Sequence, residues 1–82
     1  MKLPRNIGGD ELIKRLAEYG YKQTRQTGSH ARLTSSLKGT EHHVTIPKHN
    51  PLKVGTLNSI ITSVSEYLKK EKQQVIEELF KD

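Results

Sequence analysis

Residues 25–34 contain a histidine, His30, that directly follows Gly28 and Ser29. A histidine side chain accepts and donates protons near neutral pH, as general acid–base catalysis requires. Gly28 and Ser29 would let the backbone approach a ligand closely and present amide N–H groups to a phosphate. The same three residues would also suit a surface histidine that closes a hairpin, so the pattern alone leaves both interpretations open.

These residue types meet the needs of RNA cleavage. A base removes the proton of a ribose 2′-hydroxyl, the freed oxygen attacks the adjacent phosphorus, and an acid protonates the leaving 5′ oxygen. DNA has no 2′-hydroxyl and cannot react in this way. Four cationic side chains are candidates to bind the RNA phosphates: Arg25, Arg32, Lys48 and Lys53.

The three other histidines, His42, His43 and His49, raise the question of a metal site. Adjacent residues of a strand point to opposite faces, so His42 and His43 would not readily share an ion. Glu41 is the only carboxylate near them, and we therefore expect no bound metal. His49 beside Lys48 is either a second proton-transfer group or a solvated loop residue.

The segment 51–57, PLKVGTL, combines a lysine with Gly55 and Thr56 at the expected start of a helix. Such a start suits an anion, and it also suits an ordinary helix cap formed by Gly55 or Thr56. The segment is not a phosphate-binding P-loop, because the glycine pattern before the lysine is absent.

The composition indicates a small, basic protein. Eighty-two residues predict one domain (1–82), and a hydrophobic content of 32% with 5% aromatic residues predicts a thin core. The absence of cysteine excludes a disulfide scaffold and a cysteine-ligated zinc site. We find no signal peptide and no apolar run long enough to span a membrane, so we expect a cytoplasmic protein without membrane contact.

Positive charge is concentrated in the middle of the chain. The net charge is +5, and residues 21–53 contain six Lys or Arg, one acid and all four histidines. Such an excess favours a polyanionic partner, RNA or DNA, over the alternative that the charge serves solubility alone.

The periodicity of apolar residues predicts five elements and a possible sixth. After a basic arm (1–8), apolar positions from Leu12 to Tyr19 have helical spacing, and Gly20 is placed to end that helix. Three strands follow around residues 21–26, 30–35 and 42–46, joined by turns at Gly28 and Gly39. Ala31, Leu33, Val44 and Ile46 should face the helices, while His30, Arg32, Thr34, His43 and Thr45 should lie on the wetter face.

An amphipathic helix should run from about Leu57 to Leu68. The polar run KKEKQQ then favours a break near Lys70, followed by a short third helix within the extension 69–82. The alternatives are one continuous helix, or a tail that packs on a second chain. The order α-β-β-β-α predicts an α+β two-layer sandwich with its helices on one face of the sheet.

Three stretches in this order, GDELIKRLAEYGY, RQTGSHARL and HHVTIPKHNPLKVGTLNSII, resemble the HicA toxins of toxin–antitoxin systems. The likeness runs from about Gly9 to about Leu68. The family's G-S-H matches Gly28, Ser29 and His30, and its V-x-[IV]-P…G-T-L matches 44–47 and 55–57. The chain departs from many relatives after Ile61, where TSVSEYLKK continues a helix that they end with a glycine.

The resemblance implies a double-stranded-RNA-binding-domain-like fold. It also implies a ribonuclease (mRNA interferase) that cleaves mRNA without a metal or cofactor and arrests translation, with His30 as its essential residue. A HicB-type antitoxin would hold the protein inactive by covering this site. The alternative is a non-catalytic RNA-binding module, and the sequence does not give the oligomeric state.

Overall fold

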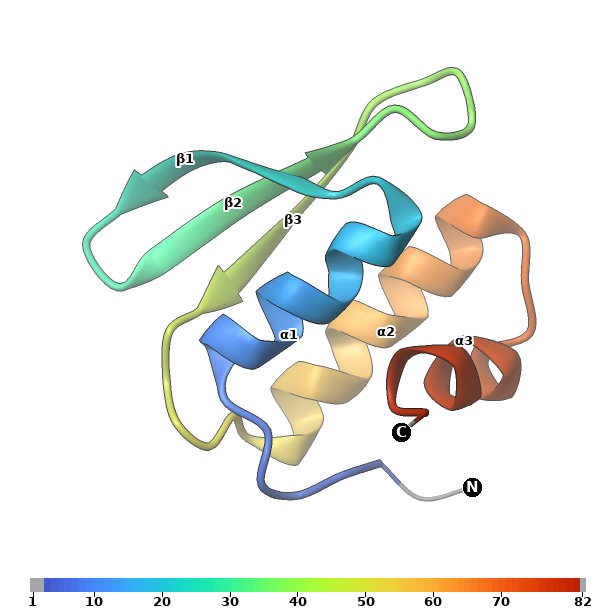
Figure 1. The fold of residues 1–82 in the computed structure, drawn as a ribbon. Helices are drawn as coiled ribbons and strands as arrows, with labels where there is room; N and C mark the ends of the chain where they lie inside the picture. Colours follow the sequence, from blue (N-terminus) through green and yellow to red (C-terminus); the bar gives the residue numbers. More distant parts are fainter. Residues whose placement is uncertain (1–2, 82) are drawn as a thin grey trace.

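One three-stranded antiparallel sheet, in the order β1-β2-β3, packs its inner face against the helices (Figure 1). The computed structural model describes residues 3–81; Met1 and Lys2 of the predicted arm and Asp82 of the predicted extension lie outside the described residues. The elements are α1 (Gly9–Leu16), β1 (Lys22–Thr27), β2 (His30–Ser35), β3 (His42–Pro47), α2 (Val54–Leu68) and α3 (Lys72–Leu79). This is the expected α+β fold, and its element order is compatible with a double-stranded-RNA-binding-domain-like arrangement.

The faces of β2 and β3 follow the predicted alternation. Ala31, Leu33, Val44 and Ile46 are buried against the helices, whereas His30, Arg32, His43 and Thr45 are exposed on the other side. We call this other side the open face of the sheet. The edge strand β1 differs, because all six of its residues are exposed. Figure 1 shows the tip of the β1–β2 hairpin projecting beyond the helices.

The first helix begins and ends at glycines. Gly9 lies so close to the end of β3 that a Cβ atom there would come within 2.2 Å of the carbonyl oxygen of Pro47. A short 3-10 turn, Ala17–Tyr19, extends α1, and Gly20 ends it with a left-handed φ of 81°. The close approach at Gly9 fixes the start of α1 against the strand end that pairs with His30.

The second helix starts earlier than the sequence indicated. Gly55 or Thr56 was one candidate to cap it, but α2 begins at Val54 with Lys53 at the N-cap position and no side-chain cap. The cap prediction is wrong, because the helix already starts at Lys53, whose carbonyl oxygen accepts from the Leu57 amide at 3.0 Å. Gly55 and Thr56 therefore lie within the first turn.

The predicted break near Lys70 is present. Lys69 takes a left-handed φ of 57°, and α3 folds back so that Val75, Ile76 and Leu79 are buried within the same chain. Arg15 Nη1 donates a hydrogen bond to the carbonyl oxygen of Leu79 at 2.7 Å, which ties α3 to α1. The apolar residues of this extension thus have partners without a second chain.

A polar contact also holds α3. Glu78 accepts hydrogen bonds from Lys70 Nζ at 2.9 Å and from Tyr19 OH at 2.5 Å. These two bonds, the one from Lys70 first, lower the pKa of Glu78 to about 2. Glu78 is therefore charged across the whole physiological range.

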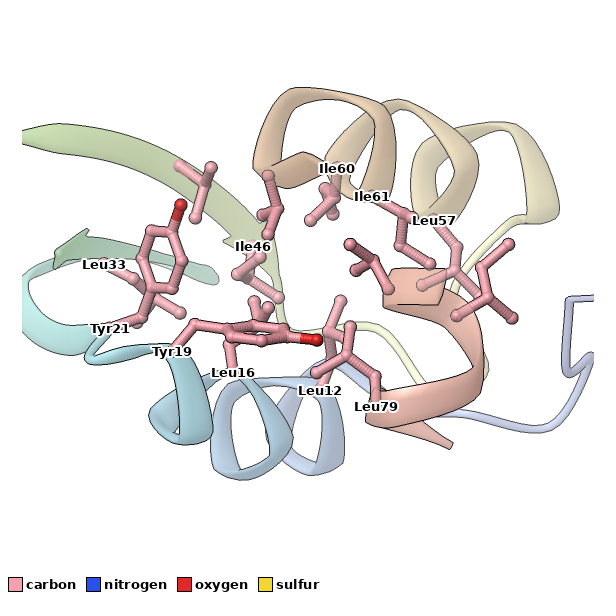
Figure 2. Close-up of a cluster of buried hydrophobic side chains, with 14 of the residues drawn as sticks. Leu12, Leu16, Tyr19, Tyr21, Leu33, Ile46, Leu57, Ile60, Ile61 and Leu79 are labelled. Carbon is pink, nitrogen blue, oxygen red and sulfur yellow. The ribbon is translucent and has the colours of Figure 1, made fainter. Parts of the chain in front are cut away.

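The hydrophobic core draws on every element except β1. Figure 2 shows part of it, and its labelled members that are at most 2% exposed are Leu12, Leu16, Tyr21, Leu33, Ile46, Leu57, Ile61 and Leu79. Burying each such leucine or isoleucine stabilises the fold by roughly 1.5–3 kcal/mol before the entropy of ordering is subtracted. None of the helices within residues 3–81 has the length and apolar character needed to cross a membrane.

Candidate active site on the open face of the sheet

His30 is the first residue of β2, directly after a two-residue turn formed by Gly28 and Ser29. Gly28 has a φ of 57° at the first central position, where hairpin turns of type II′ favour glycine. The amide of Lys48 donates a 2.7 Å hydrogen bond to the carbonyl oxygen of Ser29, which ties the turn to the segment after β3. The His30 side chain is exposed, and within residues 3–81 no hydrogen bond or ion pair engages its ring.

Two arginines lie beside His30 on the open face. Arg25 of β1 and Arg32 of β2 are direct cross-strand partners, and they line a hollow of about 220 Å³ with Thr27, His30 and Thr45. Like charges placed opposite each other in a sheet repel. Neither guanidinium forms an ion pair with any residue of the described chain. An anion between the two arginines would remove this repulsion.

A β-bulge in β1 gives Arg25 its orientation. The pairing shifts between Gln23 and Arg25, so that Gln23 lies opposite Leu33 and Arg25 lies opposite Arg32. Tyr21 and Arg25 are four residues apart, and a regular strand would point both to the same face. Because the bulge adds one residue, Tyr21 is buried against the helices while Arg25 reaches the open face.

The structure separates the two candidate lysines from this hollow. Lys48 Nζ donates to Gln26 Oε1 at 3.0 Å and lies 3.7 Å from Asp10 Oδ1. Gln26 pairs with the buried Ala31, so this lysine points to the helix side of the hairpin. Lys53 is exposed at the start of α2. Of the predicted phosphate-binding side chains, only Arg25 and Arg32 share a hollow with His30.

Comparison with known proteins identifies the family of the chain. The family model described as the HicA toxin of bacterial toxin–antitoxin systems matches residues 9–66, which include α1, the whole sheet and most of α2. The chain belongs to the HicA toxin family. No curated protein and no solved structure was found to match it. Family membership makes the chain the toxin of a toxin–antitoxin pair, with a cognate antitoxin as its partner.

In this HicA-family chain, the adjacent histidines His42 and His43 do point to opposite faces. His42 turns toward the helices, where its Nδ1 lies 2.6 Å from Tyr21 OH and its Nε2 lies 3.0 Å from Ser63 Oγ. Its ring stacks on Tyr67 with 4.7 Å between the centroids. Burial, followed by the nearby charge of His43, lowers the pKa of His42 below its ordinary value. His42 is thus a neutral packing residue.

A larger hollow than the one beside His30 lies at the start of α1 of this HicA-family chain. Its volume is about 430 Å³, and it is lined by Asn6, Gly8, Gly9, Asp10, Glu11, Lys14, Lys48, His49 and Asn50. The acidic residues Asp10 and Glu11 offset the two lysines, so this hollow suits a phosphate less well than the smaller one beside His30. His49, the other candidate for proton transfer, lies here and does not line the His30 hollow.

Metal-binding side chains are dispersed in the described part of this HicA-family toxin. Within residues 3–81, no three His, Cys, Asp or Glu side chains gather closely enough to hold a metal ion.

Proposed function

We propose that this toxin is a metal-independent endoribonuclease that cleaves mRNA in the cytoplasm and thereby arrests translation. The observation that carries the proposal is the exposed imidazole of His30, free of any described partner, in one hollow with the cross-strand pair Arg25 and Arg32. This arrangement offers a proton-transfer group beside two positive charges that only an external anion neutralises.

In this mechanism a phosphodiester of RNA binds between the two arginines. Neutral His30 accepts the proton of the ribose 2′-hydroxyl, the 2′ oxygen forms a bond to phosphorus, and the bond to the 5′ oxygen breaks. The guanidinium groups stabilise the extra negative charge of the five-coordinate phosphorus. The leaving 5′ oxygen takes up a proton, and the products are a 2′,3′-cyclic phosphate and a free 5′-hydroxyl.

The leaving oxygen receives its proton from water in this proposal, and the hydroxide so formed takes the proton that His30 accepted, which restores neutral His30. Lys48 is engaged on the helix side of the hairpin by Gln26 and Asp10, and His49 lies in the hollow at the start of α1. Gly28 and Ser29 contribute through the turn that sets the position of His30. Lys53 remains a candidate for a more distant RNA phosphate.

The cognate antitoxin of this proposal is a HicB-type protein that covers the open face. A partner with carboxylates opposite Arg25 and Arg32 would relieve the same repulsion that an RNA phosphate relieves. Toxin bound in this way would have His30 shielded from RNA.

The test is cleavage by purified toxin, free of antitoxin, with and without the substitution His30→Ala. We expect parent protein to cleave RNA in the presence of EDTA, and a single 2′-deoxy nucleotide at the cleaved linkage to block the reaction. His30→Ala should lower the cleavage rate by roughly 10²–10⁴-fold and leave RNA binding nearly unchanged. Growth arrest by the toxin expressed alone should be relieved by the same substitution.

A non-catalytic RNA-binding module is the second candidate, because the arginine pair would hold a phosphate without any proton transfer. In that case unaltered protein would retain RNA in a salt-sensitive manner and cleave none of it. Cleavage that His30→Ala leaves intact would instead assign the chemistry to another residue.

A further inference from the structure

A second hollow adjoins the His30 hollow on the open face. Its volume is about 330 Å³, and it is lined by Thr24, Arg25, Arg32, Thr34, Glu41 and His43. The two hollows share Arg25 and Arg32. An RNA backbone bound at these arginines would therefore have His30 on one side and His43 on the other.

Hydroxyl groups hold the ring of His43 in place. Thr34 Oγ1 lies 2.8 Å from His43 Nδ1, and Thr24 Oγ1 lies 2.9 Å from Thr34 Oγ1. Thr24 is the extra residue at the β-bulge, so the irregularity that orients Arg25 also supports this ring. The His43 side chain remains 40% exposed, so it is accessible to a ligand on the open face.

His43 and His30 lie at different positions along the sheet. Thr34, the partner of His43 across the strands, is four residues from His30 on β2, which corresponds to about 13 Å along the strand. The two rings line different hollows, which meet at the arginine pair. The second hollow therefore suits a neighbouring nucleotide of the same RNA.

Glu41 indicates which part of that nucleotide the hollow would bind. Its carboxylate is exposed, with Oε1 3.8 Å from His43 Nε2. A negative carboxylate repels phosphate, but it accepts hydrogen bonds from the amino group of a base. An aromatic ring beside a carboxylate suits a base that stacks on the ring and donates to the acid.

We propose that Thr34, Glu41 and His43 form a base-recognition site for a nucleotide next to the one cleaved at His30. The proposal rests on the ribonuclease function above and deepens it. The substrate is a single strand, because a base can stack on His43 only when it is unpaired. Bases with an exocyclic amino group (adenine, cytosine, guanine) are preferred over uracil at this site.

The experiment uses full-length toxin, free of antitoxin, and short synthetic RNAs built around the linkage that parent toxin cleaves fastest in a long transcript. In matched RNAs one neighbouring nucleotide, upstream or downstream, is made abasic so that its ribose and phosphate remain. We expect the abasic change on one side to lower kcat/KM about tenfold for parent toxin.

His43→Ala should lower kcat/KM about tenfold on the intact RNA and have no further effect on the abasic RNA. Thr34→Val, which keeps the side-chain shape and removes the hydroxyl, should give a smaller loss of the same kind. Gln73→Ala, an exposed change on α3, is the matched control and should behave as parent on both RNAs. Thermal melting of each variant shows whether it is folded.

Base identity provides a second readout. Parent toxin should cleave RNAs with adenine, cytosine or guanine at the recognised position faster than RNA with uracil, and Glu41→Gln should remove this difference. If parent toxin cleaves RNA but His43→Ala lowers kcat/KM as much on the abasic RNA as on the intact RNA, the base-site proposal is wrong. The ribonuclease proposal stands in that case. If parent toxin cleaves no RNA at all, the ribonuclease proposal fails first.

Discussion

Two histidines on opposite faces of the sheet, His42 and His30, differ in whether their polar groups have partners. On the helix side, the His42 ring has a partner at each nitrogen and an aromatic neighbour in Tyr67. On the open face, His30 has no described partner, and Arg25 lies opposite Arg32. A face with internal partners stabilises the fold. A face that leaves like charges opposed loses stability and gains affinity for an anion.

The largest expected effect comes from exchanging the two histidines in turn for alanine. His30→Ala should lower the cleavage rate by roughly 10²–10⁴-fold. It should change the free energy of unfolding by less than about 0.5 kcal/mol, because the His30 ring is exposed. His42→Ala should do the reverse and cost about 1–3 kcal/mol, since it leaves Tyr21 OH without its partner. Cleavage assays and urea unfolding of both variants measure this. Equal stability losses at the two sites would contradict the contrast between the faces.

Neighbouring residues of β2 should show the next largest difference. Leu33 is fully buried, and Leu33→Ala should lower the free energy of unfolding by roughly 2–5 kcal/mol. Arg32→Gln, one residue away on the open face, should not destabilise the protein. Chemical denaturation compares the two variants. A large loss for Arg32→Gln would mean that Arg32 has a structural role.

A smaller effect is expected from removing one of the two paired positive charges. Arg25→Gln should raise the free energy of unfolding by about 0.2–1 kcal/mol, because it removes the repulsion with Arg32. The same variant should bind RNA more weakly and lower the salt dependence of binding by about one phosphate contact. Lys81→Gln, which removes an exposed charge beyond α3, is the control and should change neither quantity.

The most gradual effect is the pH dependence of stability. The pKa of His42 is lower in the folded protein than in the unfolded chain, so its contribution is complete above about pH 6.5 and is lost as the pH falls. The lowered pKa of Glu78 causes a second loss between about pH 4.5 and 2. Unfolding measured from pH 8 to pH 2 should show both. His42→Gln should flatten the first phase and Glu78→Gln the second.

The sequence was informative where a simple period or a special backbone angle decided the structure. Alternation placed Leu33 inside and Arg32 outside, and the need for a left-handed residue placed the end of the first helix at Gly20. The polar run KKEKQQ (69–74) correctly indicated the break near Lys70 between α2 and α3. None of these features depends on contacts that are distant in the chain.

The sequence was uninformative where tertiary contacts decided. Nothing in the residues around Thr24 marks a bulge, because the bulge reconciles a buried Tyr21 with a two-residue turn farther along. Lys48 follows a strand end, and its direction depends on Gln26 and Asp10, which belong to other elements. The pairing of Arg25 with Arg32 beside His30 therefore could not be predicted from the sequence. The roles of these arginines in RNA binding remain predictions.

The missing side chain at Gly9 has a consequence far from α1. Its amide donates to the carbonyl oxygen of His49 at 2.9 Å, and one residue earlier the Lys48 amide holds Ser29. Even a methyl group at position 9 would force Pro47 outward, and Pro47 is the residue paired with His30. The smallest possible enlargement of the first helical turn would thus shift the strand residue that sets the position of His30, so the proposed mechanism predicts slower cleavage from a change outside the His30 hollow.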